Sequence, residues 1–219
     1  MITFNTIDFF QNLSKEDLLV AVSRLKIQYE QIEKGATVFT SHQIRDDFAI
    51  VISGTAAAEE YRSDEEKLIL YTAGPQELLI DSAVLRQEPW RVSFRALSSM
   101  EIIRLNMQAL RNPINRLEQL LLDRLYEGLI ANLDKLNTRI MITSLPSLRL
   151  KILEYLKSES KGTLPGFFFE ISLDRAAMAS YLNADRTALS KELGKMSRDG
   201  IIEFEKNRFC FLQQIPALI

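Results

Sequence analysis

Residues 173–193 constrain the fold of this chain more than any other stretch. Their sequence, LDRAAMASYLNADRTALSKEL, predicts two short amphipathic helices with a corner of about three residues between them. Asp174 and Asp185 each precede an apolar-periodic run, so we expect them to cap the two helices. Asn183 stands at the corner, where so tight a reversal needs a residue that tolerates the left-handed conformation. The stretch therefore predicts a helix-turn-helix.

The two sides of this motif differ in polarity. The side chains expected to face inward are apolar, with a small residue where the helices cross: Ala177, Met178, Ala179, Leu182, Leu189 and Leu193. The second helix turns a polar face outward, made of Arg186, Thr187, Ser190 and Lys191. In DNA-binding proteins such a helix enters the major groove, where an arginine can bind guanine O6 and N7 as a fork. The alternative is a helical hairpin with a solvated face.

The segments around this motif favour the DNA-binding interpretation. SLRLKILEYLKSES predicts a helix and FFFEIS a short strand, while IIEFEKNRFCFL predicts a hairpin with Lys206 and Asn207 at its tip. A hairpin in this place is typical of a winged helix-turn-helix. The chain as a whole carries a net charge of −2, but residues 138–219 contain 12 Lys and Arg against 9 Asp and Glu. This weak asymmetry suits an anionic partner that contacts only the C-terminal part.

The N-terminal half has a different pattern. Residues 14–26 predict a short helix with Ser14 as N-cap, and residues 29–105 contain short β-rich runs separated by turn residues. After Pro113 the pattern becomes helical. A leucine-rich stripe comprises Ile114, Leu117, Leu121, Leu125, Leu129, Leu133 and Leu136, and further apolar residues flank it at Leu120, Leu122, Tyr126 and Ile130. We expect one face to pack on the β-rich part and another on a second copy; a purely intramolecular core is the alternative.

Several classes of protein are excluded or disfavoured by composition. The single cysteine, Cys210, and the single histidine, His42, cannot supply the roughly four ligands of a zinc or iron–sulfur site. We find no phosphate loop, no metal-ligand set and no nucleophile–base pair, so we expect no catalytic residues, no metal and no cofactor. The start has no secretory signal, and no apolar run is long enough to span a membrane, so we expect a cytoplasmic protein that does not contact membranes.

These motifs resemble those of the CRP/FNR family of bacterial transcription regulators. The family's pattern of small residue, corner glycine and R-E-T-V-S-R is similar to Ala179, Asn183 and R-T-A-L-S-K here. The segments IEKGATVF, DDFAIVISG and FRALSSMEIIRL resemble its cyclic-nucleotide-type roll. Where the family usually has glutamate, which accepts from cytosine N4, this chain has Thr187. The resemblance implies a different DNA site from the common one.

The resemblance implies an α+β fold with three parts. Residues 1–110 form an antiparallel, jelly-roll-like β-roll for an effector, residues 111–137 a dimerisation helix, and residues 138–219 the winged helix-turn-helix. The implied partners are a palindromic operator in double-stranded DNA, a second copy of the chain, an unknown small-molecule effector, and RNA polymerase as a further candidate. The residues implied to contact DNA are Asp174, Arg175, Arg186, Thr187, Ser190, Lys191, Lys206 and Asn207.

The effector pocket departs from the family's pattern. Cyclic-nucleotide-binding members use a glycine-rich turn, an acidic residue and an Arg-Ser-Ala run, and the matching residues here are Gln76, Glu77, Asp81, Trp90 and Arg91. Trp90 takes the place of the arginine that binds phosphate and offers no charge to an anion. Arg91 points to the opposite face of a strand unless the register shifts by one residue. We therefore expect no response to cAMP; haem binding through His42 is a further alternative, although a polar turn favours a surface histidine.

Two functions remain open from the sequence. The first is a homodimeric, sequence-specific transcription regulator of this type with an unknown effector. The second is a ligand-binding signalling or scaffold protein whose C-terminal part contacts another protein. Binding to duplex DNA that weakens steeply with salt would distinguish the first from the second.

Overall fold

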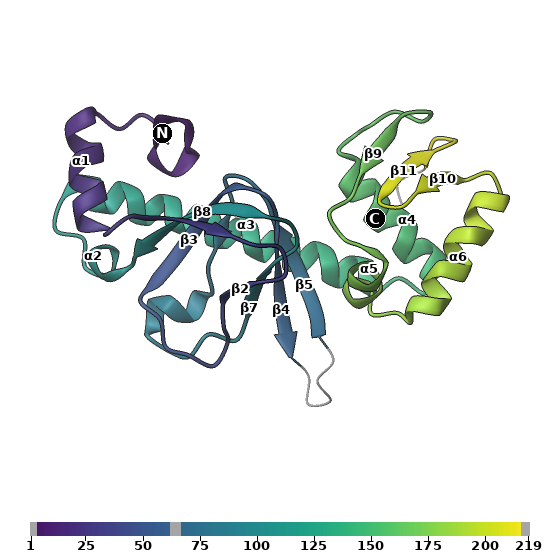
Figure 1. Ribbon diagram of the computed structural model, residues 1–219, viewed down its shortest axis with the longest axis horizontal. Coiled ribbons are helices and arrows are strands. Elements are labelled where there is room, and N and C mark those ends of the chain that lie inside the picture. Colours follow the sequence, from purple (N-terminus) through teal and green to yellow (C-terminus); the bar gives the residue numbers. More distant parts are fainter. Residues whose placement is uncertain (1–3, 62–66, 216–219) are drawn as a thin grey trace. The chain divides into compact units, whose positions relative to one another are not determined.

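The computed structural model describes residues 4–61 and 67–215 (Figure 1). Its α-helices are α1 (Lys15–Arg24), α2 (Gln108–Arg111), α3 (Arg116–Thr143), α4 (Leu148–Ser160), α5 (Arg175–Tyr181) and α6 (Arg186–Arg198). Its strands are β1 (Gln28–Ile32), β2 (Thr37–Phe39), β3 (Asp47–Ser53), β4 (Ala56–Tyr61), β5 (Lys67–Ala73), β6 (Leu78–Leu79), β7 (Ser93–Ala96), β8 (Met100–Asn106), β9 (Phe168–Glu170), β10 (Ile202–Glu205) and β11 (Arg208–Phe211). Short 3₁₀ turns are η1 (Phe4–Thr6), η2 (Asp8–Phe10) and η3 (Ser82–Arg86).

Contacts between residues divide the chain into two compact units. The first comprises Met1–Glu60 and Tyr71–Asp134, and the second comprises Tyr61–Leu70 and Lys135–Ile219. Helix α3 and strand β5 each contribute residues to both units. The boundaries after residues 110 and 137 that the sequence suggests stay predictions.

The first unit is an antiparallel β-roll, as the sequence predicts. Its strands form two four-stranded sheets in the orders β1-β8-β3-β6 and β2-β7-β4-β5. Strands β3 and β8 pair over most of their length, with Phe48 opposite Leu105 and Ile50 opposite Ile103. All four of these side chains are buried. Because apolar side chains from both strands meet in the interior, their burial is the main stabilising contribution in this unit.

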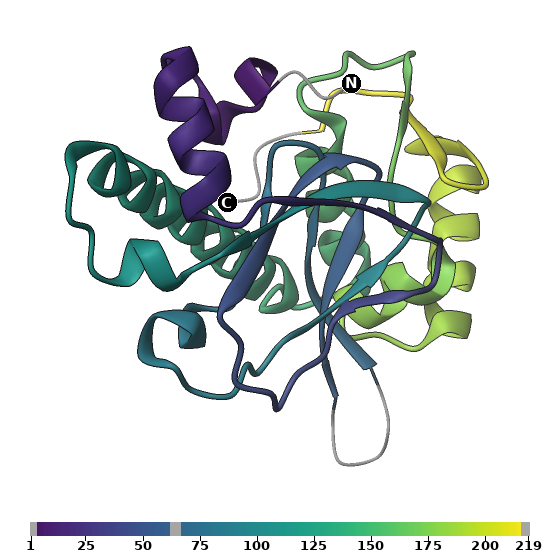
Figure 2. The same cartoon turned by 60° about the vertical axis from the view of Figure 1, so that its left-hand side comes forward.

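The N-terminal part of α3 packs along the strands of the roll (Figure 2). Gly128 permits the approach, because a Cβ atom at this position would lie 2.2 Å from Cδ1 of Leu78. One turn on, Asn132 Nδ2 donates to the Leu78 backbone oxygen at 3.3 Å. Leu121 and Leu125 are buried on the same side. Because Gly128 has no side chain, the backbone of α3 can pack directly against Leu78 in β6.

This packing corrects the leucine stripe expected from the sequence. The stripe does not form one continuous face, because Leu125 is fully buried whereas Leu133 is 54% exposed. Ile114 precedes the helix, which begins at Arg116, and is 77% exposed. The exposed apolar side is made instead by Tyr126, Ile130, Leu133, Ile140 and Met141.

The second unit contains helices α4, α5 and α6 beside a three-stranded antiparallel sheet of order β10-β11-β9 (Figure 1). Ser147 caps α4, as Ser14 caps α1 in the first unit. Strands β10 and β11 are joined by Lys206 and Asn207, with Phe204 opposite Phe209. This is the winged helix-turn-helix that the sequence predicts.

Candidate nucleic-acid interface and effector site

The corner between α5 and α6 has the local structure expected from its sequence. The Asp174 carboxylate accepts from the Ala177 backbone N–H at 2.8 Å, and the Asp185 carboxylate accepts from that of Ala188 at 2.8 Å. Asn183 has a φ of 51°, which is the left-handed conformation that the reversal requires. Both N-caps and the corner residue are thus confirmed.

The core beneath the corner is also as predicted. The six apolar residues assigned to the inner side are all buried: Ala177, Met178, Ala179, Leu182, Leu189 and Leu193. Because this side of α6 is fixed in the core, the opposite side is held outward. It carries Arg186, Thr187, Ser190 and Lys191, which are all exposed. The Ser190 hydroxyl donates to the Arg186 backbone oxygen at 3.0 Å, one turn earlier.

An ion-pair network that sequence reasoning missed holds α6 against α4. Arg149 Nε donates to Glu192 Oε1 at 2.5 Å, and Arg149 Nη2 lies 2.7 Å from Asp199 Oδ2. The hydrogen bonds that Arg149 donates to these two carboxylates raise its pKa above the ordinary value. The network joins the first turn of α4 to the middle and the C-terminal end of α6. It thereby fixes the rotation of α6 about its own axis and with it the direction of the exposed face.

Arg175, at the start of α5, is bound to the wing. Its guanidinium carbon lies 5.0 Å from the ring centre of Phe204 and 4.8 Å from that of Phe209. Its Nη2 donates to the backbone oxygen of Lys206 at 2.6 Å. Burial lowers the pKa of Arg175 from its ordinary value. The sequence predicts a DNA-backbone contact for this residue, whereas the geometry favours a role in holding the wing.

The wing turn itself is exposed at Lys206, which has a φ of 51°. The backbone oxygen of Asn207 accepts from the Ile171 N–H at 2.9 Å, so the turn is also tied to the segment after β9. The predicted DNA-binding residues Lys206 and Asn207 therefore lie in a hairpin turn that is fixed by hydrogen bonds to Arg175 and Ile171. The structure brings α6 and this wing together within one unit.

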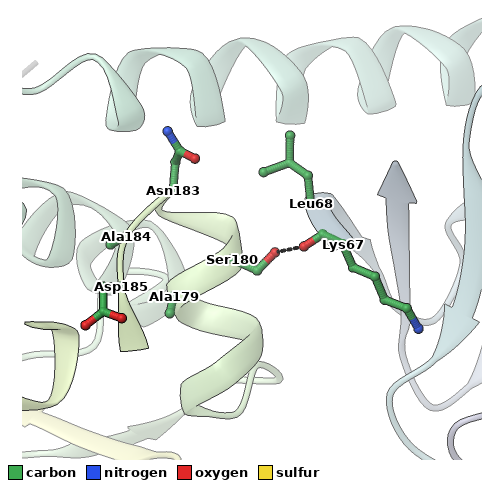
Figure 3. Close-up of a pocket in the computed structure, with 7 residues that line it drawn as sticks. All are labelled: Lys67, Leu68, Ala179, Ser180, Asn183, Ala184 and Asp185. Atoms are coloured by element: carbon green, nitrogen blue, oxygen red, sulfur yellow. Dashed lines mark hydrogen bonds between the residues drawn. The ribbon is translucent and has the colours of Figure 1, made fainter. Parts of the chain in front are cut away.

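A pocket of about 280 Å³ lies beside the corner within the second unit (Figure 3). The Ser180 hydroxyl donates to the Lys67 backbone oxygen at 2.5 Å and accepts from the Ile69 N–H at 3.0 Å. In a strand these two groups face the same edge, so one hydroxyl satisfies both. The pocket is lined by Lys67, Leu68, Ala179, Ser180, Asn183, Ala184 and Asp185.

Aromatic side chains pack against one another in the roll at the predicted effector position. Trp90 is fully buried, and its ring centre lies 4.8 Å from that of Phe39 and 6.1 Å from that of Phe94. Its Nε1–H has no hydrogen-bond partner among the described residues. Arg91, the next residue, is exposed. Trp90 and Arg91 precede β7 (Ser93–Ala96), so the strand expected at these two residues is not formed, although Trp90 does point inward and Arg91 outward. The assignment of both residues to an effector pocket stays a prediction.

The acidic residue of the predicted pocket is bound to the protein's own backbone. Asp81 is buried, and its Oδ1 accepts from the Ala83 N–H at 2.9 Å. Its Oδ2 accepts from the N–H groups of Arg91 at 2.7 Å and Val92 at 3.1 Å. These bonds hold three backbone donors from two segments around one carboxylate.

The turn residues of the predicted pocket are likewise engaged in structural contacts. Gln76 has a φ of 73°, and its side chain accepts from the Asp8 N–H at 3.0 Å and donates to the Thr6 oxygen at 3.2 Å. Glu77 Oε2 accepts from the Gly74 N–H at 2.7 Å. Gln76 therefore ties the N-terminal segment to the roll.

The remaining expectations concern metals and membranes. Among residues 4–61 and 67–215, no group of three or more His, Cys, Asp or Glu side chains is placed to hold a metal ion. His42 is exposed, and Cys210 is buried. None of the helices described is both long and apolar enough to cross a membrane.

Comparisons with known proteins agree with this architecture. The cyclic nucleotide-binding domain family matches residues 29–116. No curated protein has a sequence that matches the chain. A CooA mutant from Carboxydothermus hydrogenoformans superposes with a TM-score of 0.75 at 17% identity, covering 97% of this chain and 94% of that one.

Two further solved structures have the same fold. FixK2 from Bradyrhizobium japonicum has a TM-score of 0.72 at 12% identity, covering 85% of this chain and 93% of its own. The c-di-GMP-responsive global regulator CLP from Xanthomonas campestris has a TM-score of 0.71 at 15% identity, covering 91% and 98%. Residues 29–116 thus match the cyclic nucleotide-binding domain family, and the chain has the fold of solved structures that include CRP/FNR-family transcriptional regulators.

Proposed function

We propose that this protein is a homodimeric transcription regulator that binds a palindromic site in double-stranded DNA and has no catalytic activity of its own. One observation carries the proposal. Helix α6 is capped by Asp185, exposes Arg186 and Lys191, and belongs to the same unit as the β10–β11 hairpin that forms the wing. A helix held in this way fits the major groove, which is about 12 Å wide. Because its proposed ligand is the chromosome, we place its action in the cytoplasm.

The proposed contacts divide by chemistry. Arg186, in the first turn of α6, is assigned to a guanine, whose O6 and N7 accept a guanidinium fork. Thr187 and Ser190 offer hydroxyl and methyl groups to base edges, and Lys191 reaches a base or a phosphate. Lys206 and Asn207 at the wing tip are assigned to the DNA backbone. Asp174 and Arg175 act indirectly: Asp174 caps α5, and Arg175 holds the wing turn through the Lys206 backbone oxygen.

We propose that the second copy packs along the exposed seam of α3. Tyr126, Ile130, Leu133, Asn137 and Ile140 follow one another alternately four and three residues apart, which is the spacing of a coiled coil. All five are exposed. Ile130 and Asn137 fall at one type of core position, and Leu133 and Ile140 at the other. A single asparagine among apolar core positions is typical of a two-stranded, in-register pair.

The proposed regulator does not use cAMP. The buried ring of Trp90 gives no charge to a cyclic phosphate, and the Asp81 carboxylate already accepts from three backbone N–H groups. Any effector is therefore of another chemical class.

A titration of a labelled duplex tests this function against a protein-binding role. We expect binding to a pool of random duplexes that weakens as salt rises, with a log–log slope of about −0.9 for each phosphate contacted. Lys191→Ala should make the slope shallower by about one. Absence of any salt-dependent duplex binding by the wild-type chain would instead support the alternative, in which the C-terminal unit contacts a protein.

A further inference from the structure

Gly194 lies on the exposed face of α6, in the middle of the helix that spans Arg186–Arg198. On a helix, residues three or four apart are neighbours on one face. Lys191 precedes Gly194 by three residues, and Arg198 follows it by four. Both are exposed, while Leu193 and Met196 point into the core. Gly194 therefore occupies the gap between two outward cations.

The protein itself gives no reason for a glycine at this position. A Cβ atom built on Gly194 would meet only the Arg198 Nη1 atom, at 3.6 Å, which is an ordinary van der Waals contact. Its φ lies outside the left-handed range, so an L-residue adopts the same backbone. Glycine in a helix interior is less stable than alanine, because it loses more conformational entropy on folding. The free chain would thus gain stability from a side chain here.

Gly128 and Gly194 differ in their surroundings. Gly128 is also in a helix, but a Cβ atom there would collide with Leu78 at 2.2 Å. The close neighbour that excludes a side chain at Gly128 is present within the same chain. Among the described residues, no such close neighbour is present at Gly194.

We propose that Gly194 is a close-approach position for DNA, at which the sugar–phosphate backbone packs directly on the α6 backbone between Lys191 and Arg198. This inference rests on the proposed function and adds a residue that offers the duplex no side chain. The two flanking cations identify the approaching group as anionic, since their ammonium and guanidinium groups bind phosphates on either side. A side chain at Gly194 would then hold the helix away from the duplex and weaken both contacts.

A substitution series at Gly194 tests the proposal, because stability and DNA binding should change in opposite directions. Gly194→Ala should raise Tm by about 1–4 °C, as expected for an exposed helix position in a chain of this size. The same change should weaken DNA binding at least threefold, and the bulkier Gly194→Leu at least tenfold. The sequence selected from random duplexes should not change, because backbone contacts carry no direct sequence information.

Ser197→Ala is the matched control. Ser197 is exposed on α6 away from the line of Lys191, Gly194 and Arg198, and alanine improves helix propensity there too. We expect a higher Tm and unchanged DNA affinity. If wild type binds duplexes and Gly194→Leu binds them within twofold of wild type, the inference is overturned while the proposed function stands. A lower Tm in Gly194→Ala would also overturn it, because the glycine would then serve the free chain. A wild-type chain that binds no duplex would overturn the proposed function itself.

Discussion

Arg175 and Lys206, which are separated by 31 residues in sequence, are joined by a hydrogen bond of 2.6 Å from the guanidinium Nη2 to the backbone oxygen. The same guanidinium lies over the paired rings of Phe204 and Phe209. The first helix of the helix-turn-helix is thereby tied to the turn of the wing. The placement of the wing beside the start of α5 therefore depends on the contacts of the Arg175 side chain.

This relationship predicts how DNA binding responds to changes at Arg175. Arg175→Ala should weaken binding to all duplexes because the wing turn loses its anchor, yet it should leave the salt slope unchanged. Arg175→Lys should not restore affinity, because an ammonium group lacks the planar surface that stacks on the rings. Affinity measured over a series of salt concentrations gives both quantities. As a control, Lys206→Ala should make the slope shallower by about one. A similar loss of slope in Arg175→Ala would assign Arg175 to a phosphate.

The roll should not bind cAMP. Isothermal titration at millimolar nucleotide should give no saturable heat, because the buried Trp90 offers no charge to a phosphate and Asp81 already binds the nearby N–H groups. DNA affinity should likewise be the same with and without the nucleotide. A dissociation constant in the micromolar range would contradict this and would direct attention to Arg91 as the anion ligand.

The exposed seam of α3 should make the chain a dimer. Replacing Ile130 and Leu133 by Lys should give a monomer by light scattering, because each buried side chain of this kind contributes about 1.5–3 kcal/mol. Ala131→Lys, an exposed position off the seam, should remain dimeric. Asn137→Leu should strengthen association and loosen its specificity for two in-register chains. A wild-type chain that is monomeric at micromolar concentration would contradict dimerisation through this seam.

Acid should weaken the roll through a network centred on Arg104. Its Nε donates to Glu30 at 2.6 Å and its Nη1 to Asp47 at 2.8 Å, joining β8 to β1 and β3. The hydrogen bond from Arg104 lowers the pKa of Glu30. Burial raises the pKa of Asp47, but hydrogen bonds from Arg45 and Arg104 outweigh it and the net pKa is lowered.

The sign of the pH effect follows from these lowered pKa values. A carboxylate of this kind stabilises the fold fully above its unfolded pKa of about 4, and the contribution is lost as the pH falls through the folded pKa. Urea unfolding at a series of pH values should therefore show Glu30→Gln less stable than wild type near neutrality, with the difference disappearing as the pH falls through the lowered pKa of Glu30. The exposed Glu33→Gln should follow wild type throughout. A difference that persists unchanged at low pH would contradict the linkage.

Local features of the fold were predictable because their causes are local. Asp174 and Asp185 cap helices that begin one residue later, and Asn183 takes the left-handed conformation at the corner between them. The two-residue turn at Lys206 and Asn207 follows from the hairpin pattern around it. The family resemblance, drawn from the same segments, agrees with the matched domain and with the fold of the solved structures.

The contacts that orient these elements were not predictable, because their partners are distant in sequence. Arg149 and Glu192 are 43 residues apart, and charge pattern alone does not choose one carboxylate among many. The face that α3 turns to the roll could not be predicted from its leucines, because they lie on more than one side of the helix. Gly128 was the available signal, since a glycine inside a helix often marks a close approach.

The central claim is that two copies of α6 read an inverted repeat in DNA, and selection from random duplexes tests it most directly. Two recognition helices in a symmetric dimer should contact major grooves about 34–36 Å apart, so the selected sites should be palindromes with half-sites one helical turn apart. Arg186→Ala should bind the selected site less tightly by about 1–3 kcal/mol and lose discrimination at one position in each half-site. Selection of no inverted repeat by the wild type, or the same sequence preference in Arg186→Ala, would contradict the account.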